Sequence, residues 1–197
     1  MKRLIMIGAS GHGKVCADIA EQMGVWDEIV FADDHPPAAY PYRIIGKTDD
    51  VADGDADFFV AIGDAQIREK ITGRLKKSVT LIHPRAVIGG DVAIGNGCVV
   101  MAGAVINSGT TIGDGVIINT CSSVDHDCKL DDYVHVAVGA HLCGMVRIGK
   151  STWIGAGSTV KNNISICGGC MIGAGAVVVQ NIAEAGTYMG VPAKKRK

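Results

Sequence analysis

The sequence predicts an α/β domain with a small Rossmann-like parallel sheet over residues 1–80, followed by a parallel β-helix over residues 81–197. Two observations predict this division. Up to residue 76, apolar runs alternate with segments of helical spacing, which is the pattern of a parallel sheet and its connecting helices. From Ile88 to Val178, every sixth residue is Ile, Val or Leu, and a hexapeptide period is typical of β-helices.

In the first domain we expect the order strand, helix, strand, strand, helix. The first helical stretch is recognised by apolar Val15, Ile19 and Met23 at spacings of four, and Gly or Asp marks the strand ends. Prolines between the second and third strands indicate a loop. The expected strands are Arg3–Ile7, Glu28–Phe31 and Asp57–Ile62, and the expected helices are Lys14–Met23 and Ala65–Lys76.

In the second domain, three hexads make one triangular coil, so the sixteen hexads predict about five coils. The aliphatic residue of each hexad points inward on a flat face. The fourth residue after it is usually small or β-branched and fits near a corner, where glycines supply the permissive backbone of the turn. Cys98, Cys128 and Cys170 all fall in this corner slot, which favours packing over a zinc or redox role for Cys167-Gly-Gly-Cys170.

Composition excludes several functions. A net charge of −1 and a pI near 6.6 argue against a nucleic-acid binder, and the basic tail Lys194–Lys197 is expected to be a solvated end. No apolar run reaches the roughly 18 residues of a membrane span, and no signal peptide is recognisable. Seven cysteines without such a signal predict free thiols in a reducing cytoplasm.

Polar residues interrupt the turn glycines in one stretch, Asn119–Asp127, where His126 stands between Asp125 and Asp127. A surface histidine is usually only solvated. An adjacent carboxylate, however, fixes the imidazole tautomer and raises its basicity, as a general base requires. The 18-residue coil repeat stacks His126 beside Gly144, whose missing side chain leaves room for a thioester and whose N–H is available to an oxyanion.

Together with these residues, three further motifs carry a resemblance to a known family. The chain resembles the sugar acetyltransferases of the left-handed β-helix superfamily, most closely the UDP-4-amino-sugar N-acetyltransferases of bacillosamine biosynthesis, next to the sialic acid O-acetyltransferases. The resemblance covers Leu4 to Lys194 and implies a homotrimer with acetyl-CoA between adjacent prisms. It also implies that no metal is required. The motifs are Gly8–Gly13, Ile82-His83-Pro84 and Gly190–Lys194.

The resemblance implies a role for each site residue. His126 matches the general base and Asp127 its acidic partner, which is often Glu in the family, and Asn119 completes the catalytic set. His135, Gly144, Ala156 and Ala174 match acetyl-CoA positions. The UDP-sugar would be held by Ser10, Gly11 and His12 at a helix N-terminus, by Asp33 and Asp34, and by Gly63. The implied reaction is direct acetyl transfer to the 4-amine of the sugar.

Several alternatives remain open at this stage. An O-acetyltransferase acting on sialic acid or another glycan would use the same base and acetyl-CoA groove. A scaffold without activity, or a zinc site built from His126, His135 and His141, is compatible with a β-helix. NAD binding is disfavoured because the spacing of Gly8, Gly11 and Gly13 is not GxGxxG. The sequence does not distinguish the sugar or its configuration.

Overall fold

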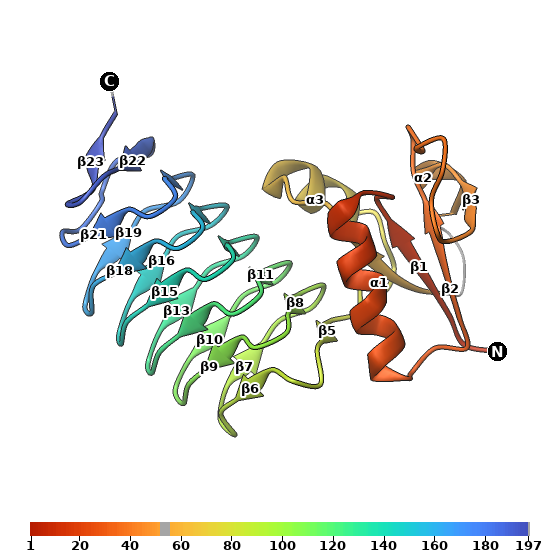
Figure 1. Ribbon diagram of the computed structural model, residues 1–197, viewed down its shortest axis with the longest axis horizontal. Coiled ribbons are helices and arrows are strands. Elements are labelled where there is room, and N and C mark those ends of the chain that lie inside the picture. The colour runs from red at the N-terminus through yellow and green to blue at the C-terminus, as the bar shows by residue number, and fades with distance from the viewer. Residues whose placement is uncertain (52–55, 197) are drawn as a thin grey trace. The chain divides into compact units, whose positions relative to one another are not determined.

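The computed structural model describes residues 1–51 and 56–196. The chain forms two compact units, Met1–Pro84 and Arg85–Lys197, which are drawn in Figure 1. Within the described residues, no helix combines the length and the apolar character needed to cross a bilayer.

The first unit is a four-stranded parallel sheet in the order β3-β2-β1-β4, with helices in the connections. Its elements are β1 (Arg3–Ile7), α1 (Gly11–Met23), β2 (Glu28–Ala32), β3 (Ile44–Gly46), α2 (Thr48–Val51), β4 (Asp57–Val60), α3 (Ala65–Thr72) and β5 (Leu81–Ile82). Four of the five residues of β1 and all four residues of β4 are buried. This burial explains why both strands, after a charged first residue, are continuous apolar runs rather than alternating ones.

Several predicted boundaries are wrong, and each has a local cause. Helix α1 begins three residues early because the Ser10 side chain accepts a hydrogen bond from the N–H of Gly13 at 3.3 Å and caps it. Helix α3 ends at Thr72 rather than Lys76, because Gly73 forms its C-cap. The elements β3 and α2 lie in the region read as a loop, since a three-residue strand and one helical turn leave no period to detect.

Gly13, in the N-terminal glycine motif, is required by packing. A Cβ at this position would overlap the carbonyl oxygen of Gly8 and lie 2.9 Å from the Tyr40 hydroxyl and 3.1 Å from the Phe31 ring. We therefore expect Gly13→Ala to lower the free energy of unfolding by about 1–3 kcal/mol, measured by urea denaturation. Gly11→Ala is the control, because nothing described lies within 4 Å of its Cβ position. Equal stability of the two variants would contradict this assignment.

The second unit is a parallel β-helix whose short strands, of two residues each except for β22, stack on three faces. The first face holds β6 (Val87–Ile88), β9 (Val105–Ile106), β12 (Ser123–Val124), β15 (His141–Leu142), β18 (Thr159–Val160) and β21 (Val177–Val178). The second face holds β7 (Ala93–Ile94), β10 (Thr111–Ile112), β13 (Lys129–Leu130), β16 (Arg147–Ile148) and β19 (Ser165–Ile166). The third face includes β8 (Val99–Val100), β11 (Ile117–Ile118), β14 (His135–Val136), β17 (Trp153–Ile154), β20 (Met171–Ile172) and β22 (Thr187–Met189). Stacked strands pair 18 residues apart, as between Ser123 and His141.

The hexad pattern predicts the core of this unit well. From Val100 to Val178, every sixth residue is at most 3% exposed, and Cys98, Cys128 and Cys170 are buried in the corner slot. Ile88 and Ile94, in the first coil, are only half-buried. The third residue after each core position has a positive φ at every corner from 97 to 175. Glycine occupies eight of these left-handed positions, and the other six hold Cys121, Asp127, Tyr133, Met145, Ser151 and Asn163.

The tail is exposed at Lys194 and Lys195, as expected, but it also has regular structure. These two residues form β23 (Lys194–Lys195), which pairs antiparallel with β22. Lys195 also forms an ion pair with Glu184. Lys197, the last residue of the predicted basic tail, lies outside the described residues.

Candidate active site

His126 and Asp127 form a hydrogen-bonded pair at the corner between the first and second faces. The Nδ1 of His126 lies 2.8 Å from Oδ2 of Asp127. Because an ionised carboxylate only accepts hydrogen bonds, Nδ1 of His126 donates to Asp127, and in the neutral imidazole the lone pair is therefore on Nε2. Asp127 reaches the imidazole despite being one methylene shorter than Glu, since it occupies a left-handed corner position with φ of 57°.

The surroundings raise the basicity of His126. The hydrogen bond to Asp127 raises the pKa of His126 above its ordinary value, and the charge of Asp125 acts in the same direction. Asp125 is held by a 2.8 Å hydrogen bond from Nδ2 of Asn107, which lowers the pKa of Asp125 and keeps it ionised. The imidazole is half exposed, so a ligand can reach Nε2.

Gly144 lies directly beside Nε2 of His126, one coil further along the same corner. A Cβ on Gly144 would be 2.5 Å from Nε2 and 2.7 Å from Cε1. The two residues are linked through the backbone, because the next residue, Met145, donates its N–H to the carbonyl of His126 at 2.9 Å. The imidazole can therefore lie against the backbone of residue 144 only because that residue has no side chain.

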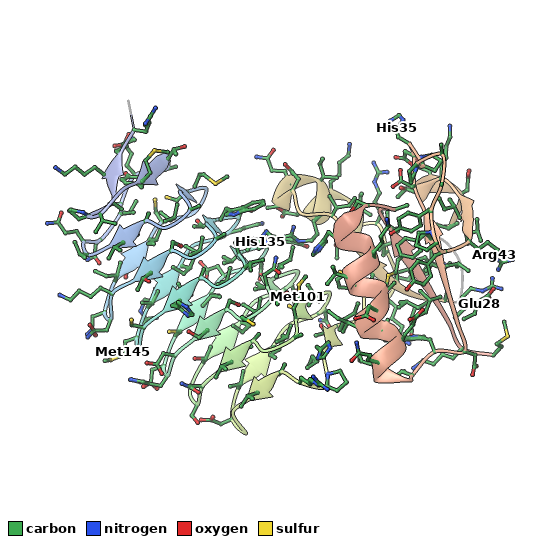
Figure 2. All side chains as sticks on the ribbon, in the orientation of Figure 1. Glu28, His35, Arg43, Met101, His135 and Met145 are labelled. Carbon is green, nitrogen blue, oxygen red and sulfur yellow. The ribbon has the colours of Figure 1, made fainter. Side chains whose placement is uncertain are left out.

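A second group of predicted residues lies at the opposite edge of the first face. The Nδ2 of Asn119 is 3.1 Å from Nε2 of His135, and the His135 ring packs against Trp153 with centroids 4.2 Å apart. Ala156 and Ala174 are exposed one coil apart at the corner between the third and first faces. Figure 2 labels Met145, next to Gly144, and His135 on opposite edges of the β-helix. Within one chain, Asn119 and His135 are thus not brought to His126.

In the first unit, the motif around Ser10 forms a compact turn at the start of α1. Ser10 caps the helix, Tyr40 donates its hydroxyl to the carbonyl of Ser10 at 3.0 Å, and no described atom lies within 4 Å of the Cβ position of Gly11. Asp33 supports this turn: its Oδ2 accepts the N–H of Ala9 at 2.6 Å and its Oδ1 accepts the N–H of His35 at 2.7 Å. Asp33 therefore stabilises the backbone of the glycine motif.

Asp33 and Asp34 line one cavity of about 250 Å³ at the carboxyl end of the sheet, with Gly8, His35 and Ile62 among its other walls. Asp34 accepts the N–H of Thr48 at 2.9 Å, which lowers the pKa of its carboxyl group. Gly63 follows Ile62 and has open space at its Cβ position among the described residues. In open parallel sheets, ligands bind at this edge.

No sequence pattern pointed to Arg68, which lies on α3 and is 1% exposed. Its guanidinium donates to the carbonyls of Ile62 and Gly63, both at 2.8 Å, and so shapes the end of β4. Burial lowers the pKa of His12 to about 4, with a smaller contribution from the charge of Arg68. His12 is consequently neutral near pH 7. The burial of Arg68 could not be predicted, because an arginine in a helix is normally expected on the surface.

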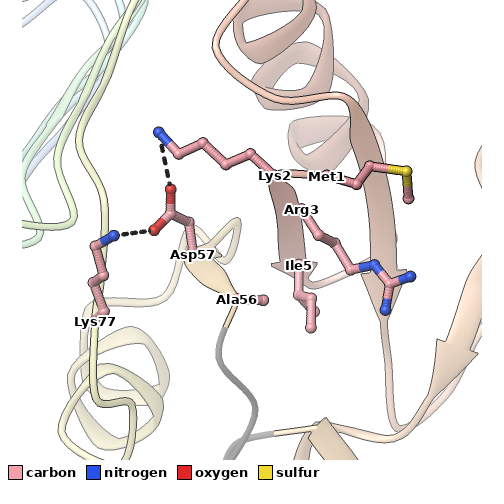
Figure 3. Close-up of a pocket in the computed structure, with 7 residues that line it drawn as sticks. All are labelled: Met1, Lys2, Arg3, Ile5, Ala56, Asp57 and Lys77. Carbon is pink, nitrogen blue, oxygen red and sulfur yellow. Dashed lines mark ion pairs between the residues drawn. The ribbon is translucent and has the colours of Figure 1, made fainter.

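A larger cavity, of about 520 Å³, lies at the amino end of β1 and β4 (Figure 3). Its centre is Asp57, which is buried and forms ion pairs with Lys2 and Lys77. Burial opposes ionisation, but hydrogen bonds from Lys77 and Trp26 outweigh it and lower the pKa of Asp57. These charges are already paired with one another, so we assign this cavity a structural role.

A hexapeptide β-helix with an activated imidazole at a corner, preceded by a small parallel α/β unit, defines an acyltransferase of the hexapeptide-repeat class. Comparisons with known proteins agree: the PglD N-terminal domain family matches residues 3–75, and the bacterial transferase hexapeptide family matches residues 145–180. The chain belongs to the hexapeptide-repeat sugar N-acetyltransferases of the PglD type.

Solved structures support this assignment over the whole chain. The acetyltransferase domain of PglB from Neisseria gonorrhoeae FA1090, in complex with acetyl coenzyme A, is 41% identical with a TM-score of 0.94, and the match covers 99% of each chain. PerB from Caulobacter crescentus, in complex with CoA and GDP-perosamine, is 33% identical with a TM-score of 0.93, covering 100% of this chain and 98% of that chain.

A curated relative points to the same chemistry. The UDP-N-acetylbacillosamine N-acetyltransferase of Bacillus subtilis (strain 168) is 32% identical over 121 residues, covering 52% of each chain. The chain spans about half the length of the curated relatives that it matches.

Proposed function

We propose that the protein transfers the acetyl group of acetyl-CoA to the 4-amino group of a UDP-linked amino-deoxy sugar of the bacillosamine type. The observation that carries the proposal is the hydrogen bond between Nδ1 of His126 and Asp127, which leaves Nε2 of the exposed imidazole, beside Gly144, as the nitrogen able to accept a proton. The structural relatives bound to acetyl coenzyme A, or to CoA and GDP-perosamine, support the co-substrate and the class of acceptor.

In the proposed reaction, the sugar amine attacks the thioester carbonyl and a C–N bond forms. The Nε2 of His126 accepts the proton that the amine loses, and the imidazolium is stabilised by Asp127. The developing oxyanion would be met by the N–H of Gly144, which in the described part of the chain donates no hydrogen bond. The C–S bond then breaks and CoA leaves as the thiolate, so His126 is the only proton acceptor needed.

Nucleotide recognition is assigned to the first unit. The N-terminus of α1 at Ser10, Gly11 and His12 would receive the diphosphate, because unpaired N–H groups and the helix dipole favour an anion. The cavity beside Asp33, Asp34 and Gly63 would receive the nucleoside. The relatives include both GDP-sugar and UDP-sugar enzymes, so the choice of UDP follows the bacillosamine relative.

A thiol-release assay with acetyl-CoA and a panel of nucleotide-linked 4-amino sugars tests this function. We expect release of CoA with a UDP-linked 4-amino sugar, and binding of free UDP by calorimetry. Release only with a GDP-linked sugar would correct the nucleotide and keep the reaction class. Acetylation of a free glycan hydroxyl, with none of the amino sugars active, would replace the proposal by an O-acetyltransferase.

We also propose that the active enzyme is a homotrimer in which each site is shared by two copies. His126 and Gly144 occupy one edge of the first face, whereas His135, Ala156 and Ala174 lie near its other edge, so one chain holds two half-sites. Coexpression of His126→Ala and His135→Ala variants should therefore restore activity that neither has alone. Absence of recovery in mixed oligomers, verified by sedimentation, would place the whole site within one chain.

The pH dependence of turnover should report the His126–Asp127 pair. Because His126 must be neutral to accept a proton and Asp127 raises its pKa, activity falls as the pH drops through that raised pKa. Asp127→Asn retains an amide oxygen that can accept from Nδ1 but removes the charge. We expect the acidic limb of kcat to move to lower pH, with a lower maximal rate. Asp131→Asn, an exposed carboxylate on the second face, should leave the profile unchanged.

A further inference from the structure

The corner between β19 and β20 holds two cysteines that face each other. The Sγ atoms of Cys167 and Cys170 are 3.6 Å apart, and only Gly168 and Gly169 separate them in the chain. The proposed acetyl transfer uses neither thiol, and the corner lies between the second and third faces, away from His126. The hexad pattern explained Cys170 as packing but left its contact with Cys167 without a role.

The backbone of this corner is fixed by the preceding coil. Thr152 donates its hydroxyl to the carbonyl of Cys167 at 3.0 Å and accepts the N–H of Cys170 at 3.2 Å. The N–H of Gly169 donates to the carbonyl of Lys150 at 2.9 Å. The two thiols are therefore held in proximity by bonds that do not involve sulfur. An S–S bond of about 2.05 Å requires a closure of about 1.5 Å, shared by two side chains.

The other cysteines in the same slot provide the contrast. Cys98 and Cys128 are buried like Cys170, but the residue three positions earlier is Gly95 or Asp125, so neither has a thiol across its corner. Cys121 is exposed at a left-handed corner position without a neighbouring cysteine in its hexad. Among the hexads, only the one at residues 167–170 has cysteine both one and four residues after its core aliphatic residue, Ile166.

Exposure differs between the two thiols. Cys167 is half-buried and open to a small reagent, whereas Cys170 is 2% exposed. Burial also raises the pKa of Cys170 to about 11, which disfavours its thiolate in the resting state. This asymmetry makes Cys167 the attacking residue and Cys170 the resolving one.

We propose that Cys167 and Cys170 form a dithiol that is converted to an intrachain disulfide by exchange with a small-molecule disulfide. The Cys167 thiolate attacks one sulfur of the reagent, forming a mixed disulfide and releasing one small thiolate. The Cys170 thiolate then attacks the Cys167 sulfur and releases the second. Two protein thiols lose two electrons and two protons overall, and one reagent disulfide is reduced to two thiols.

The disulfide would act on the last part of the β-helix. The corner supports the segment leading to β22 through hydrogen bonds from the N–H of Cys167 to Ile182 and of Met171 to Gly186. In the reduced protein, the Cys170 thiol also points at the carbonyl of Glu184, at 3.8 Å. Oxidation removes that S–H donor while tying the two ends of the corner together. We therefore expect the disulfide to change the hydrogen bonding of residues 182–186 and to leave His126 unaffected.

Oxidised glutathione is the probe for the test. Incubation of the reduced protein should yield a peptide linked between residues 167 and 170, in which two thiols and about 2 Da are lost and no glutathione adduct is present. Cys167→Ser should abolish the loss without altering the core, and Cys121→Ser, which removes an exposed lone cysteine, should retain it. A lasting glutathione adduct on Cys167, or the same thiol loss in Cys167→Ser, would overturn the proposal.

A second measurement uses the unmodified chain and needs no variant to fold. A trivalent arsenical such as phenylarsine oxide binds two thiols held close together, so it should bind one equivalent and protect the protein from oxidation by glutathione disulfide. Binding that maps to other cysteines, or no protection, would show that the two thiols do not act as a pair.

Discussion

Replacing His126 by alanine should lower turnover on the order of 10² to 10⁴-fold, with little change in affinity for the nucleotide sugar. In its neutral form the imidazole provides the proposed proton acceptor beside Gly144, and the proposed nucleotide pocket lies in the other unit of the chain. Turnover is measured by thiol release from acetyl-CoA under saturating conditions, and affinity by calorimetry with the free nucleotide.

Two features make this variant informative. His126 is exposed at a corner, so its removal leaves no cavity and should not alter the unfolding transition. Lys129→Ala, an exposed change three residues further on the second face, serves as the control and should retain full activity. Unchanged turnover in folded His126→Ala protein would remove the residue from the mechanism.

Addition of a single methyl group at Gly144 should reduce turnover on the order of 10²-fold while leaving the fold intact. The new Cβ would lie 2.5 Å from Nε2, so the imidazole has to rotate away. That movement costs little stability, because the displaced atoms are the free end of an exposed side chain. It costs activity, because the base loses its position and the thioester loses the space beside it.

Gly90→Ala is a matched control for this substitution. Gly90 lies in the same β-helix, has open space at its Cβ position among the described residues and, like Gly144, lacks a positive φ. Both variants should unfold at similar denaturant concentrations, and only Gly144→Ala should lose activity. If both lose activity equally, the effect comes from backbone restriction rather than from contact with His126.

The β-helix was predictable in detail because its repeat relates sequence to space directly. Counting 18 residues from His126 reaches Gly144, and the structure places the two in contact. The same count could not show which corners tolerate a left-handed residue other than glycine. Asp127 has no turn glycine to mark it, and its contact with His126 follows from that backbone conformation.

The first unit was less predictable because tertiary contacts decide its details. The carboxylate of Asp33 binds the N–H of Ala9, a contact between residues 24 apart that no periodicity reveals. Strand β3 exists because it pairs with the edge of β2, not because its three residues have a strand pattern. The buried position of Arg68 likewise depends on the carbonyls at the end of β4.

The repeated left-handed position separates the requirements of folding from the choice of chemistry. Since the backbone has a positive φ at every corner from 97 to 175, glycine can replace Asp127 without a change of backbone conformation. Side chains can thus be exchanged at these corners, and the coil number determines where along the β-helix each side chain lies. Such a scaffold could acquire, lose or relocate a carboxylate beside an imidazole through single substitutions, with the hydrophobic interior untouched.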